Sequence, residues 1–199
     1  MSEVLFTSAS KQASLIREGS LKVTDLLELH FEQVDKLNSK INAIISIRSR
    51  DDLMQEAKVL ENTKSKGWLH GIPIAIKDLA ETKGLRTTWG SPIFKDHIPD
   101  FDSIVSQRIK DAGAIIIGKT NTPEFGLGSH SYNPVHGVTL NPYDITKSAG
   151  GSSGGAAAAL AANLLPVADG SDMMGSLRNP GAFNNIYGFR PSWGLVPKD

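Results

Sequence analysis

The amino-acid sequence predicts an α/β fold, in which helices pack against a sheet that contains parallel strands. From Gly71 onward, short apolar segments alternate with helical segments and glycine-rich loops. The segment Ala-Ile-Ile-Ile at 114–117 is typical of a buried strand, because β-branched side chains fit a pleated surface. The order strand, helix, strand requires crossover connections, and these place neighbouring strands parallel to one another.

Composition excludes several classes of function. The 199 residues are 40% hydrophobic and 21% charged, as expected for one globular domain. The 21 basic and 21 acidic residues balance to a net charge of zero, which argues against a general nucleic-acid binder. Without cysteine the chain has no disulfide, no thiolate zinc site and no cysteine nucleophile. The five histidines show no metal-ligand spacing, so no metal site is predicted.

The chain is predicted to be a cytoplasmic protein that does not enter a membrane. Its first residues lack the basic region and the long apolar stretch of a signal peptide. The most apolar run, 156–165, is shorter than the ~20 residues that cross a bilayer, and Asn163 interrupts it.

Residues 1–65 are predicted to form a helical layer. We expect a helix over 8–17, a longer helix for which Thr24 is the N-cap, and a third helix over 51–64. A brief strand is expected at 42–47. This layer would pack over the part of the domain that follows it.

Residues 66–199 are predicted to form the catalytic α/β part of the same domain. The apolar run 71–78 is too short for a helix and is expected to be a strand. Helices are predicted over 102–112 and 155–164, and a further strand over 165–168.

The segment 113–120, Gly-Ala-Ile-Ile-Ile-Gly-Lys-Thr, matches the pattern of a phosphate-binding loop without its context. That loop needs a strand before its first glycine and a helix after its lysine. Here a helix precedes Gly113, the intervening residues are themselves a strand, and Pro123 follows closely. Nucleotide binding is therefore not predicted.

Two serine clusters lie in glycine-rich surroundings. The first, Gly-Gly-Ser-Ser-Gly-Gly at 150–155, directly precedes an apolar helix, which is unusual for a flexible linker. The second, at 170–180, follows a predicted strand, where ligands and catalytic groups collect in α/β sheets. Asp172 and Arg178 flank Ser176 and could pair to hold that loop rigid. Taken alone, each cluster also fits a purely structural role.

A serine hydroxyl needs a base before it can act as a nucleophile. No histidine stands in a recognised relation to either cluster, and the G-x-S-x-G elbow is absent. Lys77 ends the apolar run 72–76, and burial there would lower the pKa of its amine. The alternative is a lysine that reaches the surface at a strand end.

Taken together, these segments resemble the amidase signature family. The order of the motifs matches, as do the separations of 75 residues from Lys77 to Ser152 and 24 residues from Ser152 to Ser176. The matching motifs are Gly71-Ile-Pro-Ile-Ala-Ile-Lys77-Asp78, Lys119-Thr-Asn121, Glu124-Phe125, Asn141-Pro142, Gly150-Gly-Ser-Ser-Gly-Gly155, Gly175-Ser-Leu-Arg178 and Gly188-Phe-Arg-Pro191. The resemblance implies an α/β/α fold around a mixed central sheet, of which residues 1–199 would supply only the N-terminal part.

The resemblance also implies roles for individual residues. Ser176 would be the nucleophile, Ser152 the bridging serine after a cis peptide bond from Gly151, and Lys77 the base. Ser153 would hydrogen-bond the lysine from its other side.

Backbone N–H groups of the residues before the nucleophile would form an oxyanion hole, supported by Asp172 and Arg178. In this chain those groups belong to Met173, Met174, Gly175 and Ser176. The family usually has glycine at the position of Met174. Either a positive φ there strains the methionine and distorts the oxyanion hole, or the backbone is unchanged and Met174 narrows the acyl pocket. We favour the second interpretation because methionine is unbranched and adaptable.

The resemblance implies hydrolysis of a small carboxylic amide through a serine acyl-enzyme, without a metal or an organic cofactor. The loop around Ser176 looks closer to a bacterial branch that includes aminohexanoate cyclic-dimer hydrolases. One alternative is the glutaminase-type subunit of a tRNA-dependent amidotransferase. Another is a non-catalytic fragment that acts as an interaction module. A homodimer is compatible with the sequence.

Overall fold

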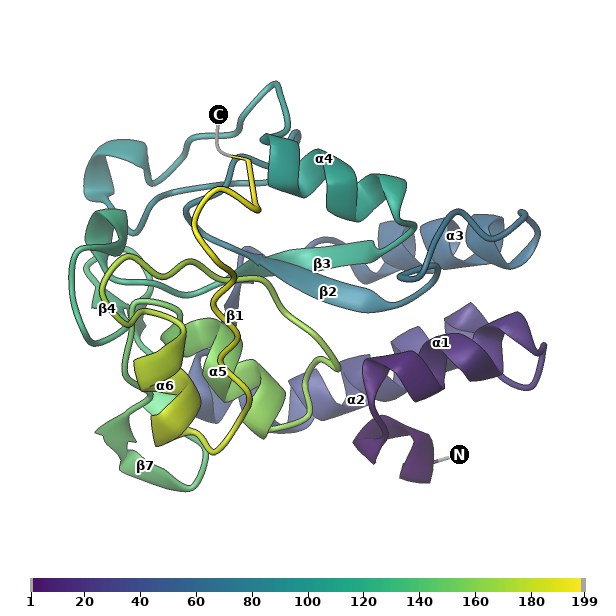
Figure 1. The fold of residues 1–199 in the computed structure, drawn as a ribbon, viewed down its shortest axis with the longest axis horizontal. Helices are drawn as coiled ribbons and strands as arrows, with labels where there is room; N and C mark the ends of the chain where they lie inside the picture. Colours follow the sequence, from purple (N-terminus) through teal and green to yellow (C-terminus); the bar gives the residue numbers. More distant parts are fainter. Residues whose placement is uncertain (1, 198–199) are drawn as a thin grey trace.

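A three-stranded mixed sheet lies at the centre of the computed structural model, which describes residues 2–197 (Figure 1). Its strands are β1 (Ile44–Ile45), β2 (Pro73–Lys77) and β3 (Ile115–Thr120), in the order β1-β3-β2. β2 and β3 are parallel, whereas β1 and β3 are antiparallel. The predicted mixed α/β architecture is therefore present.

Helices connect and cover these strands. The connection from β2 to β3 contains α4, as expected because parallel strands need a long crossover. In Figure 1, α4 lies on one side of β2 and β3, and α2 lies on the other. The α-helices are α1 (Ala9–Arg17), α2 (Val23–Ile41), α3 (Arg50–Glu61), α4 (Ile104–Asp111), α5 (Gly154–Ala161) and α6 (Arg178–Phe183). Three short 3-10 helices are η1 (Ser2–Phe6), η2 (Pro92–Phe94) and η3 (Glu124–Gly126).

Two small antiparallel pairs complete the described secondary structure. They are formed by β4 (Tyr132–Asn133) with β5 (Gly137–Val138), and by β6 (Leu140–Asn141) with β7 (Asp144–Ser148). The second pair precedes the loop that leads into α5.

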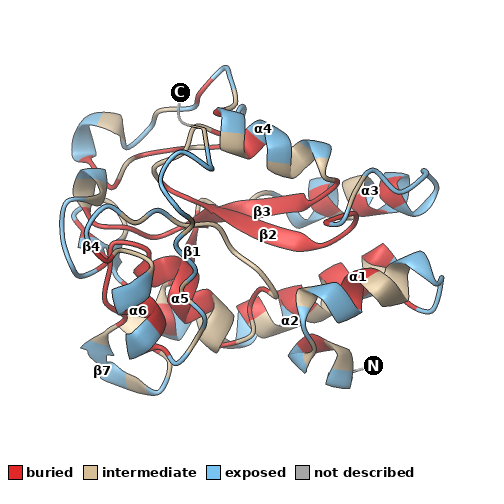
Figure 2. Cartoon of the chain, in the orientation of Figure 1, coloured by how far each residue is buried: buried red, intermediate tan, exposed pale blue. Residues whose placement is uncertain are grey.

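The two faces of the central sheet pack into two hydrophobic clusters. Successive side chains of a strand point to opposite faces, so Ile115 and Ile117 of β3 pack with apolar side chains of α2, α3 and α5. Ile116 packs instead with Ile74 and Ile76 of β2, in a cluster that α1 and α4 complete. Figure 2 shows both strands buried along their length. The ends of β2 and β3 are thus held in a solid core, and side chains there are fixed in position.

The helical prediction for the first 65 residues is confirmed with shifted boundaries. Ser8 caps α1, as the predicted helix over 8–17 requires. Thr24 as the N-cap of α2 was wrong, because α2 begins at Val23 and the Thr24 hydroxyl donates to Glu61 at 2.6 Å. The predicted strand at 42–47 is reduced to the two residues of β1.

Other boundaries also differ from expectation. α3 starts after its cap Ser49 and ends at Glu61, short of the predicted residue 64. The predicted strand over 165–168 is wrong: this segment pairs with no strand of the described chain. Pro166 has no N–H to donate to a ladder, which disfavours pairing at that residue.

The segment that matches a phosphate-binding loop forms β3, as its apolar residues predict. Lys119 is fully buried, and its amine donates to Ala80 O and to Thr82 Oγ1. It therefore holds the turn after β2 and is unavailable to a phosphate group. Within residues 2–197, no helix is both long and apolar enough to cross a membrane.

His30 should make stability depend on pH between about 6.5 and 4. Its Nδ1 donates to Leu164 O at 3.0 Å, and burial lowers the pKa of the imidazole to about 4. The unfolded chain binds a proton below pH 6.5 while the folded chain does not, so stability is lost as pH falls through this window. Urea unfolding at several pH values measures the free energy of unfolding across this window. In the His30→Gln variant, the fall in that free energy between pH 6.5 and 4 should be smaller by about 3 kcal/mol than in the parent chain. If the unfolding free energy of this variant depended on pH as strongly as that of the parent chain, the prediction would be contradicted.

Candidate active site

Lys77 is the last residue of β2, and its amine is buried. The side chain is 1% exposed, which rules out the alternative of a lysine that reaches the surface. Burial lowers the pKa of the amine to about 8, against the opposing charges of Asp169 and Asp172. Within the described chain, no carboxylate lies within ion-pair distance of Nζ. A substantial neutral fraction near neutral pH is what a lysine base requires.

Two consecutive serines surround this amine. The peptide bond between Gly151 and Ser152 is cis, as the family resemblance implied. Lys77 Nζ lies 2.7 Å from Ser152 Oγ and 2.9 Å from Ser153 Oγ. The structure therefore brings these three predicted site residues together, although the chain separates Lys77 from the serines by 75 residues or more.

Neighbouring groups fix the loop that carries these serines. Ser131 Oγ donates to Ser152 O at 3.1 Å and accepts the N–H of Gly154 at 3.0 Å. Ser153 is the N-cap residue of α5, but its hydroxyl makes no capping bond. That hydroxyl contacts Lys77 and donates to Ser171 O at 3.2 Å instead.

Ser171 is a third hydroxyl at the amine, and sequence reasoning did not single it out. Its Oγ lies 3.0 Å from Lys77 Nζ. Asp169, also missed, accepts the backbone N–H of Lys77 at 2.6 Å. Both lie in the segment that links the predicted strand 165–168 to Ser176. The only sequence signal for them was that Asp169 directly precedes the second serine cluster and that Ser171 is its second residue.

The hydrogen bonds around Lys77 accommodate both the protonated and the neutral amine. The Ser153 proton is used on Ser171 O, so Ser153 Oγ must accept an N–H from Lys77. Ser171 Oγ can accept the second N–H. The protonated amine donates its third N–H to Ser152 Oγ at 2.7 Å, and in the neutral amine the nitrogen lone pair faces that hydroxyl instead.

Asp172 organises the loop before Ser176. Its buried carboxylate accepts the backbone N–H of Gly175 at 2.7 Å and of Leu177 at 3.2 Å. The predicted pair with Arg178 is confirmed, with Arg178 Nε 2.9 Å from Asp172 Oδ2. These donors hold the pKa of Asp172 well below its usual range, the Arg178 bond being the largest cause.

Ser176 reaches the site through its main chain. Its carbonyl accepts the N–H of Ser153 at 3.0 Å, which ties the two serine clusters together. Among the described residues, the Ser176 hydroxyl forms no hydrogen bond, so the structure leaves the link from Ser152 to Ser176 open. Catalytic hydrogen bonds are often loose without substrate.

The predicted oxyanion donors differ in availability. The N–H of Gly175 is engaged by Asp172, so the groups free of a described protein acceptor are those of Met173, Met174 and Ser176. Met174 does not adopt a positive φ, whereas Gly175 does at +116°. The interpretation that Met174 is strained is therefore wrong. The Met174 side chain is 82% exposed, and its effect on an acyl pocket stays a prediction.

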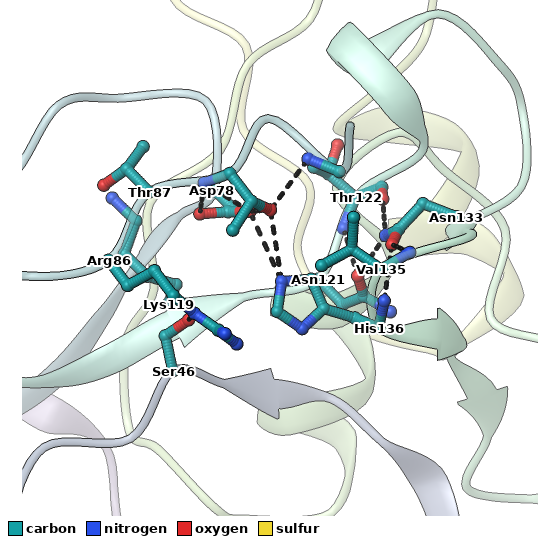
Figure 3. Close-up of polar contacts among 12 residues, drawn as sticks. Ser46, Asp78, Arg86, Thr87, Lys119, Asn121, Thr122, Asn133, Val135 and His136 are labelled. Atoms are coloured by element: carbon teal, nitrogen blue, oxygen red, sulfur yellow. Dashed lines mark hydrogen bonds and ion pairs between the residues drawn. The ribbon is translucent and has the colours of Figure 1, made fainter. Parts of the chain in front are cut away.

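A polar network supports the end of β2 (Figure 3). Asp78, which follows Lys77, accepts the Thr88 hydroxyl at 2.5 Å and lies 3.9 Å from His136 Nε2. Burial lowers the pKa of His136 to about 4, so this imidazole is neutral at pH 7 and forms no ion pair. Asn133 donates to Asn121 Oδ1 at 2.8 Å beside them. The network fixes the chain directly after the lysine.

A comparison with protein families matches residues 25–199 to the family described as Amidase. The chain belongs to this family. It is 43% identical over 183 residues to a glutamyl-tRNA(Gln) amidotransferase subunit of Saccharolobus solfataricus. That match covers 92% of this chain and 38% of the relative.

Solved structures of the amidase family share the fold. A bacterial aryl acylamidase of the amidase signature enzymes superimposes with a TM-score of 0.90 at 32% identity, covering 96% of this chain and 41% of that one. A 6-aminohexanoate cyclic dimer hydrolase complexed with substrate gives a TM-score of 0.81 at 37% identity, covering 89% and 36%. The predicted amidase signature fold is confirmed, and the chain spans about two fifths of the length of these relatives.

The close packing of α5 against the sheet can be tested by enlarging Gly155. A Cβ on Gly155 would lie 2.3 Å from Asn121 N and 2.7 Å from Ala43 O, which are backbone atoms that cannot move aside. Gly155→Ala should therefore push α5 away from the sheet, destabilise the fold by about 1–3 kcal/mol in urea unfolding, and separate Ser153 from Lys77. Ala161→Ser, at the far end of α5, should cost less than about 1 kcal/mol. Equal stability of Gly155→Ala and the parent chain would contradict this packing.

Proposed function

We propose that this chain carries the nucleophile, the bridging serine and the base of an amidohydrolase that cleaves a carboxylic amide. The observation that carries the proposal is the buried Lys77 amine at 2.7 Å from Ser152 Oγ and 2.9 Å from Ser153 Oγ. Membership of the amidase family supports the same chemistry.

In the proposed reaction, neutral Lys77 takes the Ser152 proton, and Ser152 takes the Ser176 proton. Ser176 Oγ bonds to the amide carbonyl carbon, whose oxygen becomes an oxyanion facing the N–H groups of Met173, Met174 and Ser176. Such donors typically contribute ~3–4 kcal/mol each. The C–N bond then breaks, and the proton returns through Ser152 to the leaving nitrogen. Water attacks the acyl-enzyme ester, releasing the acid and restoring the Ser176 hydroxyl.

The substrate we propose is a small, non-peptide amide. The 37% identity to a hydrolase of a cyclic amide dimer favours this class. The 43% identity to one subunit of an amidotransferase favours a second candidate, release of ammonia from glutamine for transfer within a complex. Release of ammonia from glutamine only in the presence of partner subunits would select the second candidate.

A purely structural role as an interaction module is less well supported. Three hydroxyls around an amine of lowered pKa have no evident value for docking, and burying an amine costs stability. Cytoplasmic location and a homodimer remain predictions from the sequence.

A serine-directed fluorophosphonate probe tests the nucleophile. It should phosphonylate Ser176 in the 199-residue chain, and peptide mass spectrometry should locate the adduct there. Ser176→Ala and Lys77→Ala should each reduce labelling at least ~100-fold, because one removes the attacking oxygen and the other its base. Lys147→Ala, an exposed lysine on β7, is the matched control and should label like the parent. Labelling that survives Lys77→Ala would refute the proposed base.

The labelling rate should rise with pH through a midpoint near 8. The reactive form contains neutral Lys77, and its amine is protonated below the pKa of about 8. Below that midpoint the rate should fall about tenfold per pH unit. Rates measured from pH 6 to 9.5, with Ser176→Ala as the background, check this. A flat profile over this range would contradict it.

A further inference from the structure

Asp169 attaches the segment before Ser176 to the edge of β2. Its Oδ1 accepts the Lys77 N–H at 2.6 Å. The neighbouring N–H of Asp78 bonds to Thr120 O of β3, so the Lys77 N–H points toward the opposite edge. No described strand pairs with β2 at that edge. The Asp169 carboxylate therefore satisfies a backbone donor that a neighbouring strand would otherwise take.

The segment 169–171 contacts both the main chain and the side-chain amine of Lys77. Asp169 binds its main-chain nitrogen, and Ser171, two residues later, lies 3.0 Å from Nζ. Ser153 is bonded to the same segment, because its hydroxyl donates to Ser171 O at 3.2 Å. A change at Asp169 would therefore displace Ser171 and alter the hydroxyls around the amine.

Asp169 also supplies charge near the amine. Burial raises the pKa of Asp169, while Lys77 and Lys119 oppose that rise. In return, the Asp169 charge raises the pKa of Lys77 more than Asp172 does. Asp172 is itself paired with Arg178. The packed helix α5, Gly-Gly-Ala-Ala-Ala-Ala-Leu-Ala, brings no charged side chain to the amine.

We propose that Asp169 is a positioning residue for the Lys77 amine. Its carboxylate anchors the Lys77 main chain to the Ser171 segment and places a negative charge beside the strand end that carries the amine. The proposal rests on the proposed function only in taking Lys77 as the base.

Two substitutions separate anchoring from charge. Asp169→Asn keeps an oxygen that can accept the Lys77 N–H but removes the charge, whereas Asp169→Ala removes both. The Lys77 titration is followed by NMR of chains labelled with ¹³C at the lysine ε-carbon, and Lys77→Met identifies its signal. Both variants should move the titration midpoint from about 8 to lower pH, by about one unit.

The fluorophosphonate labelling rate on the high-pH plateau gives the second readout. Asp169→Ala should lose about tenfold, the effect of one hydrogen bond to a charged group, and Asp169→Asn should restore most of it. A residue that only stabilised the fold would lower thermal stability without moving the Lys77 midpoint.

Asp96→Asn is the matched control, since Asp96 is 80% exposed and lies 3.9 Å from Lys95. This variant should leave the Lys77 midpoint unchanged. A midpoint in folded Asp169→Asn that stays near 8 or rises would overturn the proposal.

Hydrogen exchange in the unaltered chain provides a test that needs no variant to fold. The Lys77 amide should be protected to the same degree as amides bonded between β2 and β3. Exchange as fast as in an exposed loop would overturn the anchoring.

The NMR titration needs no turnover, so the two proposals can fail separately. A lowered midpoint without labelling of Ser176 keeps the positioning role and refutes the hydrolase function. Labelling of Ser176 with an unmoved Lys77 midpoint keeps the hydrolase function and refutes the positioning role of Asp169.

Discussion

The structure depends on one buried amine, that of Lys77, which is surrounded by hydroxyls and has no ion-pair partner among the described residues. Lys77 is 1% exposed, and within residues 2–197 its Nζ is contacted by Ser152, Ser153 and Ser171. Removing a cation from water is costly, and the protein meets this cost partly by making the neutral form accessible. Such a site requires rigid supports on every side. The isoleucine-rich strands hold Lys77 itself, and the close contact of α5 with the sheet holds the loop of Ser152 and Ser153. Hydrogen bonds with Ser153 hold Ser171.

Much of this arrangement is readable from local sequence. β2 and β3 follow from short isoleucine-rich runs, and Lys77 stands out because it ends one of them. The serines at 152 and 153 are marked by flanking glycines, of which Gly155 permits close approach to Asn121 and Ala43. Ser171 and Asp169 escaped notice because they meet Lys77 across 94 and 92 residues of chain, and no local pattern encodes such a contact. Tertiary partners likewise overrode local preference at Thr24, which bonds to Glu61.

Relatives with different names match the same region of this chain. An amidotransferase component at 43% identity, a cyclic dimer hydrolase at 37% and an aryl acylamidase at 32% all match nearly the whole of this chain, which covers 36–41% of each. Proteins with such different names share this region, so the region by itself does not identify a substrate. Met173 and Met174 are both largely exposed and precede Ser176 in the same loop, and their effect on the choice of acyl group stays a prediction.

The enclosure of the amine at position 77 has a consequence for sequence variation. Arginine is the usual replacement for lysine on protein surfaces, but a guanidinium keeps its proton throughout the range in which proteins are folded. It is also wider and would force apart the two segments whose three hydroxyls converge here. A substitution that most comparisons score as conservative is therefore forbidden at this position on grounds of both acidity and shape.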